Sequence, residues 1–417
     1  MGQKAGWDWA VGEKSVLDLT LLKKDYEWLE EVQFGPDGEK VAIIVKKDDG
    51  FGVTINGHPW EETYSKAWFL RFSPDGRVTV LVNQDGEWTL SVDGENWPET
   101  YGYIWDVKYS QTGKVIAAAV QNDSAYGMAV NGRTWEALFE NANNFTLSKD
   151  GRSAAAVVQT IPLGIADLET FQKGCYTVAV DTRTWERNFV GVWTPVFSPD
   201  AGRVAAQVRL SLYDYTIAVD GRPWPQSFAS VWEPVFNPVT GAVVAPVRSA
   251  GKWGLAQDGG LIWPAVYFQC WHQAISPDGR KVYAIIAKDF GRFTVAVDAK
   301  PWSQNFEVVT DLNLSPDGRR AAALIKEHDR WTVMADGSVW SGSYSRVWPP
   351  VFSPDGRNIA AKVERNKKFT YVLNGKEYRD EFETVCDPVF SPEGDKLLFR
   401  MVNQGRAWRR IVKLSDF

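Results

Sequence analysis

The sequence repeats itself with a period of about 38 residues, and this periodicity constrains the fold more than any other feature. Turn segments of the type Ser-Pro-Asp-Gly, or close variants, recur ten times in 417 residues, at spacings of 37 to 39 residues except for one interval of 51. A near-constant period flanked by β-branched and aromatic residues indicates a repeat architecture. The turns end at Gly38, Gly76, Gly113, Gly151, Gly202, Gly241, Gly279, Gly318, Gly356 and Gly394.

A second turn signal lies between successive turns of the first kind. It is an asparagine or aspartate, usually followed by glycine, at the end of a strand-like run. Such residues tolerate the positive φ angles of tight hairpin turns, so each marks a second hairpin, and two hairpins predict four antiparallel strands per repeat. The positions are Asn56, Asp93, Asn131, Asp181, Asp220, Asp258, Asp298, Asp336 and Asn374.

Three series of aromatic residues follow this second turn. The first series is Trp60, Trp97, Trp135, Trp185, Trp224, Trp263, Trp302, Trp340 and Tyr378. The second series lies four residues later, at Tyr64, Tyr101, Phe139, Phe189, Phe228, Tyr267, Phe306, Tyr344 and Phe382. The third series lies four residues further on, at Trp68, Trp105, Trp193, Trp232, Trp271 and Trp348, and is interrupted by Asn143, Thr310 and Cys386.

A four-stranded repeat of this length is typical of a propeller blade, which is buried on both faces by its neighbours. We therefore predict an all-β fold: a single β-propeller of about ten four-stranded blades over residues 16–417, after an N-terminal arm at residues 1–15. The last turn is followed by only two plausible strands, 396–402 and 408–414, and we expect residues 16–22 to supply the missing outer strand. Pairing of the terminal strands closes the fold and removes its free edges. A solenoid is the alternative, but no polar capping repeats are evident.

The long interval places an insertion between the second and third strands of one blade, on the face opposite the repeated turns. Its apolar residues are Ile161, Leu163 and Ile165. Insertions into one repeat often carry binding function, although a surface loop that has drifted is an equal alternative.

Composition narrows the function classes. The net charge of −6 and the pI near 5.4 argue against nucleic acid as a partner. No apolar run has the length of a signal peptide or a membrane span, so we expect contact with a membrane only through partners. Three widely spaced cysteines, Cys175, Cys270 and Cys386, favour a reducing, cytoplasmic setting.

Catalytic signatures are absent from the sequence. There is no G-x-S-x-G elbow, H-E-x-x-H motif or P-loop, so we expect a non-enzymatic chain without cofactor or metal. His58, His272 and His328 fall in different repeats at different phases. The cluster Cys270-Trp271-His272 offers too few ligands for a zinc or iron site.

The segments Phe72–Arg77 and Phe352–Arg357, both Phe-Ser-Pro-Asp-Gly-Arg, resemble the WD40-like repeats of the TolB type. True WD40 blades add a Gly-His pair and a Trp-Asp dipeptide at the end of the third strand, whereas this chain has only three histidines and its third strands mostly end in Asp-Gly or Asn-Gly. With 21 tryptophans, the chain also resembles the tryptophan-rich subunit of the Tmc transmembrane redox complex of sulfate-reducing bacteria. That resemblance implies a cofactor-free cytoplasmic subunit at the inner face of the cytoplasmic membrane, associated with an iron–sulfur protein, a membrane cytochrome b and a multihaem cytochrome c.

Two functional hypotheses follow. The leading one is a non-catalytic propeller subunit that scaffolds or docks partners in a membrane-associated electron-transfer complex, as in sulfate respiration. The alternative is a free-standing propeller that binds a small molecule or carbohydrate over its central channel. The first tryptophan series is expected to cover the gaps between blades. The third series is expected where one blade crosses to the next, near the channel mouth, as a set of partner-binding indoles or as plain packing residues.

Overall fold

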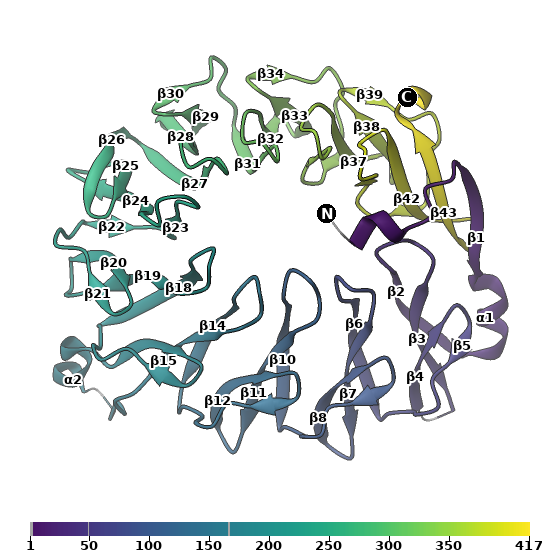
Figure 1. Cartoon of the computed structure of the whole chain (residues 1–417), viewed down its shortest axis with the longest axis horizontal. Helices are drawn as coiled ribbons and strands as arrows, with labels where there is room; N and C mark the ends of the chain where they lie inside the picture. The colour runs from purple at the N-terminus through teal and green to yellow at the C-terminus, as the bar shows by residue number, and fades with distance from the viewer. Residues whose placement is uncertain (1–2, 49, 166) are drawn as a thin grey trace. The chain divides into compact units, whose positions relative to one another are not determined.

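The fold is a ten-bladed β-propeller, as the repeat predicts. The computed structural model describes residues 3–48, 50–165 and 167–417, so Met1 and Gly2 of the predicted arm and Ala166 of the insertion lie outside the described residues. Within these ranges, antiparallel strands form ten sheets, each a blade of four strands (Figure 1). Three blades have their first strand split into two short pieces.

The strands follow one another in simple up-and-down order within a blade, so each blade is built from consecutive residues. In the first five blades along the chain, the strands are β2 (Trp28–Phe34), β3 (Val41–Lys47), β4 (Gly50–Ile55) and β5 (His58–Pro59); β6 (Lys66–Phe72), β7 (Val78–Gln84), β8 (Glu87–Val92) and β9 (Glu95–Asn96); β10 (Tyr103–Tyr109), β11 (Ile116–Asn122), β12 (Ala125–Val130) and β13 (Arg133–Thr134); β14 (Ala142–Leu147), β15 (Ala154–Gln159), β16 (Tyr176–Val180) and β17 (Arg183–Thr184); β18 (Gly191–Phe197), β19 (Val204–Arg209), β20 (Tyr215–Val219) and β21 (Arg222–Pro223).

The remaining five blades repeat this order, and the last one takes its outer strand, β1, from the start of the chain. Their strands are β22 (Ser230–Val231), β23 (Val235–Phe236), β24 (Val243–Ser249), β25 (Lys252–Gln257) and β26 (Gly260–Tyr267); β27 (Gln269–Ile275), β28 (Val282–Asp289), β29 (Arg292–Val297) and β30 (Lys300–Pro301); β31 (Val308–Leu314), β32 (Ala321–Glu327), β33 (Arg330–Ala335) and β34 (Ser338–Val339); β35 (Arg346–Val347), β36 (Val351–Phe352), β37 (Ile359–Arg365), β38 (Lys368–Leu373) and β39 (Lys376–Glu377); β40 (Thr384–Val385), β41 (Val389–Phe390), β42 (Lys396–Asn403), β43 (Arg406–Lys413) and β1 (Gly12–Asp18).

Helical structure is confined to short segments. The α-helices are α1 (Leu19–Asp25) and α2 (Leu168–Lys173), and the 3₁₀ helices are η1 (Gln3–Gly6) and η2 (Leu414–Asp416). None of the helices in the described ranges is long and apolar enough to cross a membrane. The chain divides into two compact units, residues 1–80 with 276–417 and residues 81–275, and each is described by itself below.

The Ser-Pro-Asp-Gly turn is held by its own side chains. In the turn after β14, the Ser148 hydroxyl donates to the Asp150 carboxylate over 2.7 Å and accepts from the backbone N–H of Ser153 over 3.1 Å. Asp150 also accepts from the backbone N–H of Arg152 over 3.0 Å. Serine and aspartate two residues apart therefore satisfy the polar groups of a tight turn. The same serine–aspartate bond recurs at Ser198–Asp200, Ser276–Asp278, Ser315–Asp317 and Ser353–Asp355.

The asparagine or aspartate of the second turn ties the two hairpins of a blade together. Asn131 accepts from the backbone N–H of Ile116 over 2.9 Å through its side chain, and its own N–H donates to the Ile116 carbonyl over 2.8 Å. Its φ of +47° is the left-handed conformation that asparagine and aspartate adopt most readily after glycine. Both requirements together explain why only these two residue types occupy the position. The same side-chain acceptor occurs at Asn56, Asp181, Asp220, Asp258, Asp298, Asp336 and Asn374.

The first tryptophan series joins adjacent blades, as expected. A Cβ atom added at Gly132, which has φ of +76°, would lie only 3.2 Å from Cγ of Trp97 in the preceding blade. A glycine is required there both by its backbone conformation and by the close approach of the ring. The equivalent contacts are Trp185 on Gly221, Trp224 on Gly259, Trp302 on Gly337 and Trp340 on Gly375.

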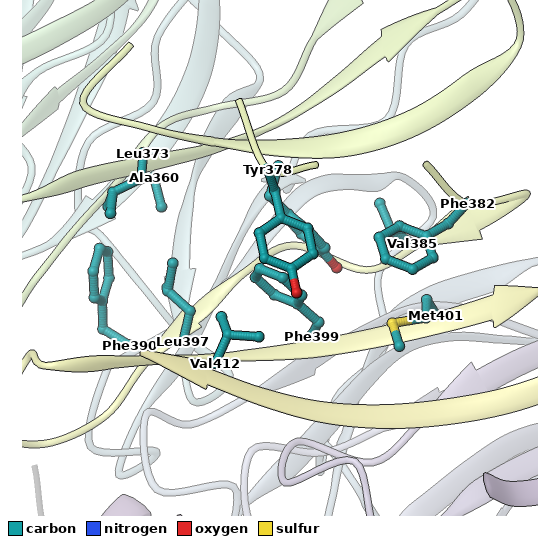
Figure 2. Packing of buried hydrophobic residues seen from close by; sticks show 11 residues of the cluster. Ala360, Leu373, Tyr378, Phe382, Val385, Phe390, Leu397, Phe399, Met401 and Val412 are labelled. Carbon is teal, nitrogen blue, oxygen red and sulfur yellow. The ribbon is translucent and has the colours of Figure 1, made fainter. Parts of the chain in front are cut away.

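Apolar side chains fill the space between neighbouring blades. Small alanines of the second strands alternate with larger residues, as in the cluster around Ala154 and Ala156 between the β10–β13 and β14–β17 blades. Figure 2 shows the corresponding cluster between the last two blades, where Tyr378 lies over Phe399. The rings of Tyr371 and Phe399 stack there at 3.9 Å between centroids.

The two ends of the chain pair with each other inside the first unit. Strand β1 runs antiparallel to β43, from Gly12 opposite Ile411 to Asp18 opposite Arg406, and the two lie side by side in Figure 1. The predicted closure is therefore confirmed, but the predicted position of the strand at residues 16–22 is wrong. The strand ends at Asp18, whose side chain accepts from the backbone N–H of Thr20 and caps helix α1.

The buried Arg409 of β43 links this closing sheet to the first blade. Its Nε donates to the carbonyl of Asp37 over 2.9 Å and lies 2.9 Å from the Glu39 carboxylate. A second nitrogen of the guanidinium donates to the carbonyl of Asp8. Because the residue is only 3% exposed, these partners are needed to offset the cost of burying its charge.

We expect Asn131→Ala to destabilise the protein and Asn131→Asp to leave it nearly unchanged. Alanine removes the acceptor for the Ile116 N–H and is strained at positive φ, which together cost about 2–4 kcal/mol of unfolding free energy. Aspartate keeps both the acceptor and the conformational tolerance, so its cost should be below about 1 kcal/mol. Thermal unfolding followed by circular dichroism measures both. Equal thermal unfolding midpoints for the two variants would contradict a stabilising role of the Asn131 side chain.

We also expect the repeated turns to weaken in acid. Hydrogen bonds from the Arg152 backbone and the Ser148 hydroxyl lower the pKa of Asp150 to about 2. A carboxyl whose pKa is depressed in the folded state contributes stability above its unfolded pKa of about 4, and this contribution is lost as the pH falls toward 2. Asp150→Asn should therefore lose less stability than the wild type between pH 5 and pH 2 in urea titrations. A parallel pH dependence of the two proteins would rule out this contribution.

Candidate functional site

Four members of the third tryptophan series, Trp68, Trp105, Trp193 and Trp271, lie at the third residue of the first strand of their blade. Trp193 of β18 pairs with Gln207 just before a shift in register, and the next residue, Thr194, has φ of +48°. The sequence predicts the series where one blade crosses to the next, and these four residues lie near the start of the strand that follows this crossing. A β-bulge explains the arrangement, since it adds a residue to one strand and re-aims the neighbouring side chains. A residue with positive φ also follows Trp68, Trp105 and Trp271.

The other two members of the series stand where proline interrupts the strand. Trp232 follows β22, and its backbone N–H donates to the Pro246 carbonyl over 2.9 Å. Trp348 follows β35, and its backbone N–H donates to the Lys362 carbonyl over 3.0 Å. Pro234 and Pro350 lie two residues further on in the same gaps. The series therefore occupies one structural position in all six blades.

Four indoles of this series, Trp105, Trp193, Trp232 and Trp348, pack on an aromatic residue of the third strand of their own blade. The ring centroids of Trp193 and Tyr215 are 6.3 Å apart, and those of Trp232 and Trp253 are 5.5 Å apart with an interplanar angle of 11°. Sequence analysis missed these third-strand residues, although they recur with the repeat. They also pair with the second aromatic series, as Phe51–Tyr64, Trp88–Tyr101, Tyr126–Phe139, Tyr176–Phe189, Tyr215–Phe228, Trp253–Tyr267, Phe293–Phe306, Trp331–Tyr344 and Phe369–Phe382.

Three indoles of the third series, from strands of three successive blades and all within residues 81–275, line one pocket. The pocket has a volume of about 590 Å³ and its lining is mainly apolar, with a few polar groups. Both properties are typical of ligand sites in proteins. It is lined by Trp193, Thr194, Gln207, Trp232, Glu233, Val235, Trp271, His272 and Gln273.

Trp232 presents one ring face to this pocket. One face of its indole is covered by the nearly parallel ring of Trp253, yet half of the residue (50%) is exposed to solvent. Trp193 has the same arrangement against Tyr215, with 38% exposed. Because the covered face fixes each ring, the free face is a rigid apolar platform.

The polar groups of the pocket have different roles. Gln273 is buried, and its amide donates to the carbonyls of Glu233 and Val244 over 2.5 and 3.3 Å, so it fixes the backbone beside the indoles. The Glu233 side chain makes no ion pair or hydrogen bond with any residue that the structure describes. Partial burial raises the pKa of Glu233, and the nearby His272 opposes this shift. The Glu233 carboxylate thus lies among three indoles, with His272 nearby.

The remaining tryptophans of the series are placed differently. Trp105 packs against Tyr103 and Phe145, at 5.7 and 5.8 Å between centroids. In the first unit, Trp68 is 37% exposed, and the ring of Trp348 lies close to two cations of its own blade, Arg346 and Lys362. The pocket therefore gathers only Trp193, Trp232 and Trp271 of the six predicted residues.

The insertion lies where the sequence predicts, between β15 and β16, and contains helix α2. Ile165 is fully exposed and Ile161 is 39% exposed, while Leu163 is half-buried. None of the three lines the tryptophan pocket. The insertion and the pocket are therefore two separate candidate surfaces.

Among the described residues, the potential metal ligands differ in their surroundings. Cys270 is buried, and burial raises the pKa of its thiol. Atoms of Glu307, Glu327 and His328 lie within 4.8 Å of one another, a grouping that sequence analysis did not single out. The Glu327 carboxylate is already bound by Arg292 over 2.9 Å, so an arginine supplies the positive charge at this cluster.

We expect the first and third tryptophan series to differ sharply in their contribution to stability. Trp224 is 7% exposed and seals the contact between two blades, so Trp224→Ala should cost about 3–5 kcal/mol. Trp232→Ala removes a half-exposed ring and one aromatic pair, and should cost about 1–2 kcal/mol. Urea unfolding of the two variants tests this difference. A larger loss for Trp232→Ala would identify the third series as structural.

Comparison with known proteins gives only distant similarities. No protein-family model matches the sequence, and no curated protein matches it. A crystal structure of the eukaryotic initiation factor covers 88% of this chain and 90% of its own, at 13% identity and a TM-score of 0.44. A TolB structure from Agrobacterium tumefaciens covers 45% of this chain and 74% of its own, at 19% identity and a TM-score of 0.27. A structure of prolyl endopeptidases covers 72% of this chain and 54% of its own, at 13% identity and a TM-score of 0.39. At these scores the similarities carry no argument about function.

Proposed function

We propose that this chain is a non-catalytic scaffold that binds a protein partner through the tryptophan pocket of its second unit. The observation that carries the proposal is the convergence of Trp193, Trp232 and Trp271 on one pocket with their rings partly exposed. Tryptophan is enriched among the residues that dominate binding energy at interfaces, because a rigid ring buries a large area at a small entropic cost.

The rigidity of the site supports this proposal. The aromatic residues behind Trp193 and Trp232 and the hydrogen bonds of Gln273 hold the indoles in place before any partner arrives. A preorganised surface loses less entropy on binding than a mobile one. The exposed Ile161 and Ile165 of the insertion, together with the half-buried Leu163, offer a second contact surface for the same or another partner.

A more specific form of the proposal follows from the resemblance in tryptophan content to the Tmc subunit. In this form the chain docks an iron–sulfur protein, a membrane cytochrome b and a multihaem cytochrome c in a membrane-associated electron-transfer complex. The chain would then lie at the inner face of the cytoplasmic membrane and reach the membrane only through those partners. Tryptophan content and the propeller architecture are its support.

A second candidate function is the binding of a small molecule or carbohydrate. The volume of about 590 Å³ lies within the range of small-ligand sites, and indole faces beside amide and carboxylate groups suit a sugar ring. This alternative predicts ligand-dependent thermal stabilisation of the isolated chain and no stable partner.

We expect a partner captured from native cells by the tagged chain in mild detergent to be lost when Trp193 and Trp232 are both replaced by alanine. Removing two anchor rings should weaken binding by about 2–4 kcal/mol, which lowers affinity about 30-fold or more. Quantitative mass spectrometry of the captured proteins gives the readout. Haem absorbance together with cytochrome and iron–sulfur peptides would support the redox-complex form.

The matched control is Trp28→Ala, which removes a 60% exposed tryptophan of β2 that belongs to none of the three series. This variant should capture partners as the wild type does. Equal loss in both variants would indicate nonspecific adhesion of exposed tryptophan. A colourless chain without any specific partner would contradict the scaffold proposal and favour the small-ligand alternative.

A further inference from the structure

We propose that the Trp193–Trp232–Trp271 pocket binds a cationic side chain, an arginine or lysine of the protein partner, between its indole faces and the Glu233 carboxylate. This inference rests on the proposed scaffold function and names the chemistry that the pocket recognises. Positive groups are attracted to the face of an indole and to a carboxylate alike, so the two features favour the same ligand.

The protein itself shows how a third-series indole holds a cation. In the β35–β39 blade, the Lys362 ammonium lies 4.4 Å from the ring centroid of Trp348, and the Arg346 guanidinium lies 5.2 Å from it. Lys362 is also paired with the Asp387 carboxylate over 3.0 Å. Within one unit of the chain, the Lys362 ammonium is thus bound by both an indole ring, Trp348, and a carboxylate, Asp387.

The equivalent positions around Trp232 carry no cation. Trp232 and Trp348 make the same backbone hydrogen bond to the second strand, so Pro246 occupies the position of Lys362. Two residues before the tryptophan, Ser230 occupies the position of Arg346. In the two pocket indoles on either side, the residues two places before the tryptophan are Gly191 and Gln269, and no lysine or arginine lines the pocket in the described part of the chain.

The carboxylate that would pair with such a cation is present. Glu233 directly follows Trp232, where the β35–β39 blade has a proline, Pro349, after its tryptophan. Its side chain lines the pocket and has no ion-pair or hydrogen-bonding partner among the residues that the structure describes. His272 is the basic side chain of the lining, and it forms no ion pair with Glu233.

The test is a titration of the full-length chain, labelled with ¹⁵N at tryptophan, with N-acetyl-arginine methylamide. The neutral near-isostere N-acetyl-citrulline methylamide is the matched ligand control. Single Trp→Phe variants assign the indole N–H signals of Trp193, Trp232 and Trp271. We expect saturable shifts of these signals with the arginine compound and at least tenfold weaker effects with the citrulline compound.

Two protein variants complete the test. Glu233→Gln should weaken binding of the arginine compound about three- to tenfold, because a neutral amide replaces the carboxylate. Ser230→Arg should abolish binding, because it supplies an internal guanidinium like that of Arg346, whereas Ser230→Gln, of similar reach and without charge, should bind normally. Equal shifts with citrulline, or unchanged affinity in Glu233→Gln, would overturn the inference.

The outcome is separable from that of the proposed function. If the arginine compound fails to bind but partner capture still depends on Trp193 and Trp232, the scaffold proposal stands and the cationic ligand is excluded. If a neutral methyl glycoside produces the saturable shifts instead, the pocket is a carbohydrate site and the inference is overturned. If the arginine compound binds in the pocket but no partner is captured, the ligand chemistry is supported and the scaffold role fails.

Discussion

The contact of a tryptophan ring with the glycine turn of the following blade is the interaction on which the rest of the fold depends. A blade of four strands has two broad faces, and neither can be covered by residues of the same blade. Trp97 on Gly132 illustrates the solution: the ring needs a backbone without a side chain, and the turn needs a residue that accepts positive φ. The hairpin tie through Asn131 then places that glycine at a fixed distance from the second strand. Each blade is thereby stabilised by its contacts with the blades next to it in the sequence.

The two ends of such a chain have no sequence neighbour to pair with. Within the first unit, strand β1 from the start of the chain pairs with β43 from its end. The closing sheet combines strands from both ends of the sequence, and the buried Arg409 binds the first turn region through the Asp37 carbonyl and Glu39. A backbone edge that would otherwise be free to pair with another chain is thus used internally. A sheet built from such repeats therefore needs the pairing of its terminal strands to cover its last free edge.

The sequence predicts those features that recur in every blade, because repetition makes a weak local signal strong. Turn positions, strand number and the role of the first tryptophan series were all accessible in this way. The position of the closing strand was not, because residues 16–22 are apolar with a spacing that suits a strand or a helix, and the cap formed by Asp18 decides between them. The bulge that contains Thr194 and the positive φ angle of His272 were also inaccessible, since no glycine marks either position. The candidate pocket depends on those bulges, so its three tryptophans could be named from sequence while their convergence could not.

Differences between equivalent positions of the repeats carry the functional information. One structural position holds Trp232 in one blade, Trp348 in another and Thr310 in a third, so packing alone does not demand tryptophan there. Around Trp348 the chain supplies its own cations, and the aromatic face and the carboxylate of the neighbouring blade are both satisfied. Around Trp232 the same backbone carries serine and proline at the cationic positions, and a glutamate that forms no ion pair or hydrogen bond with the residues that the structure describes. The blades thus serve as internal controls for one another: a shared fold fixes the indole, and the residues that differ decide whether its face is occupied by the protein itself or offered to a ligand.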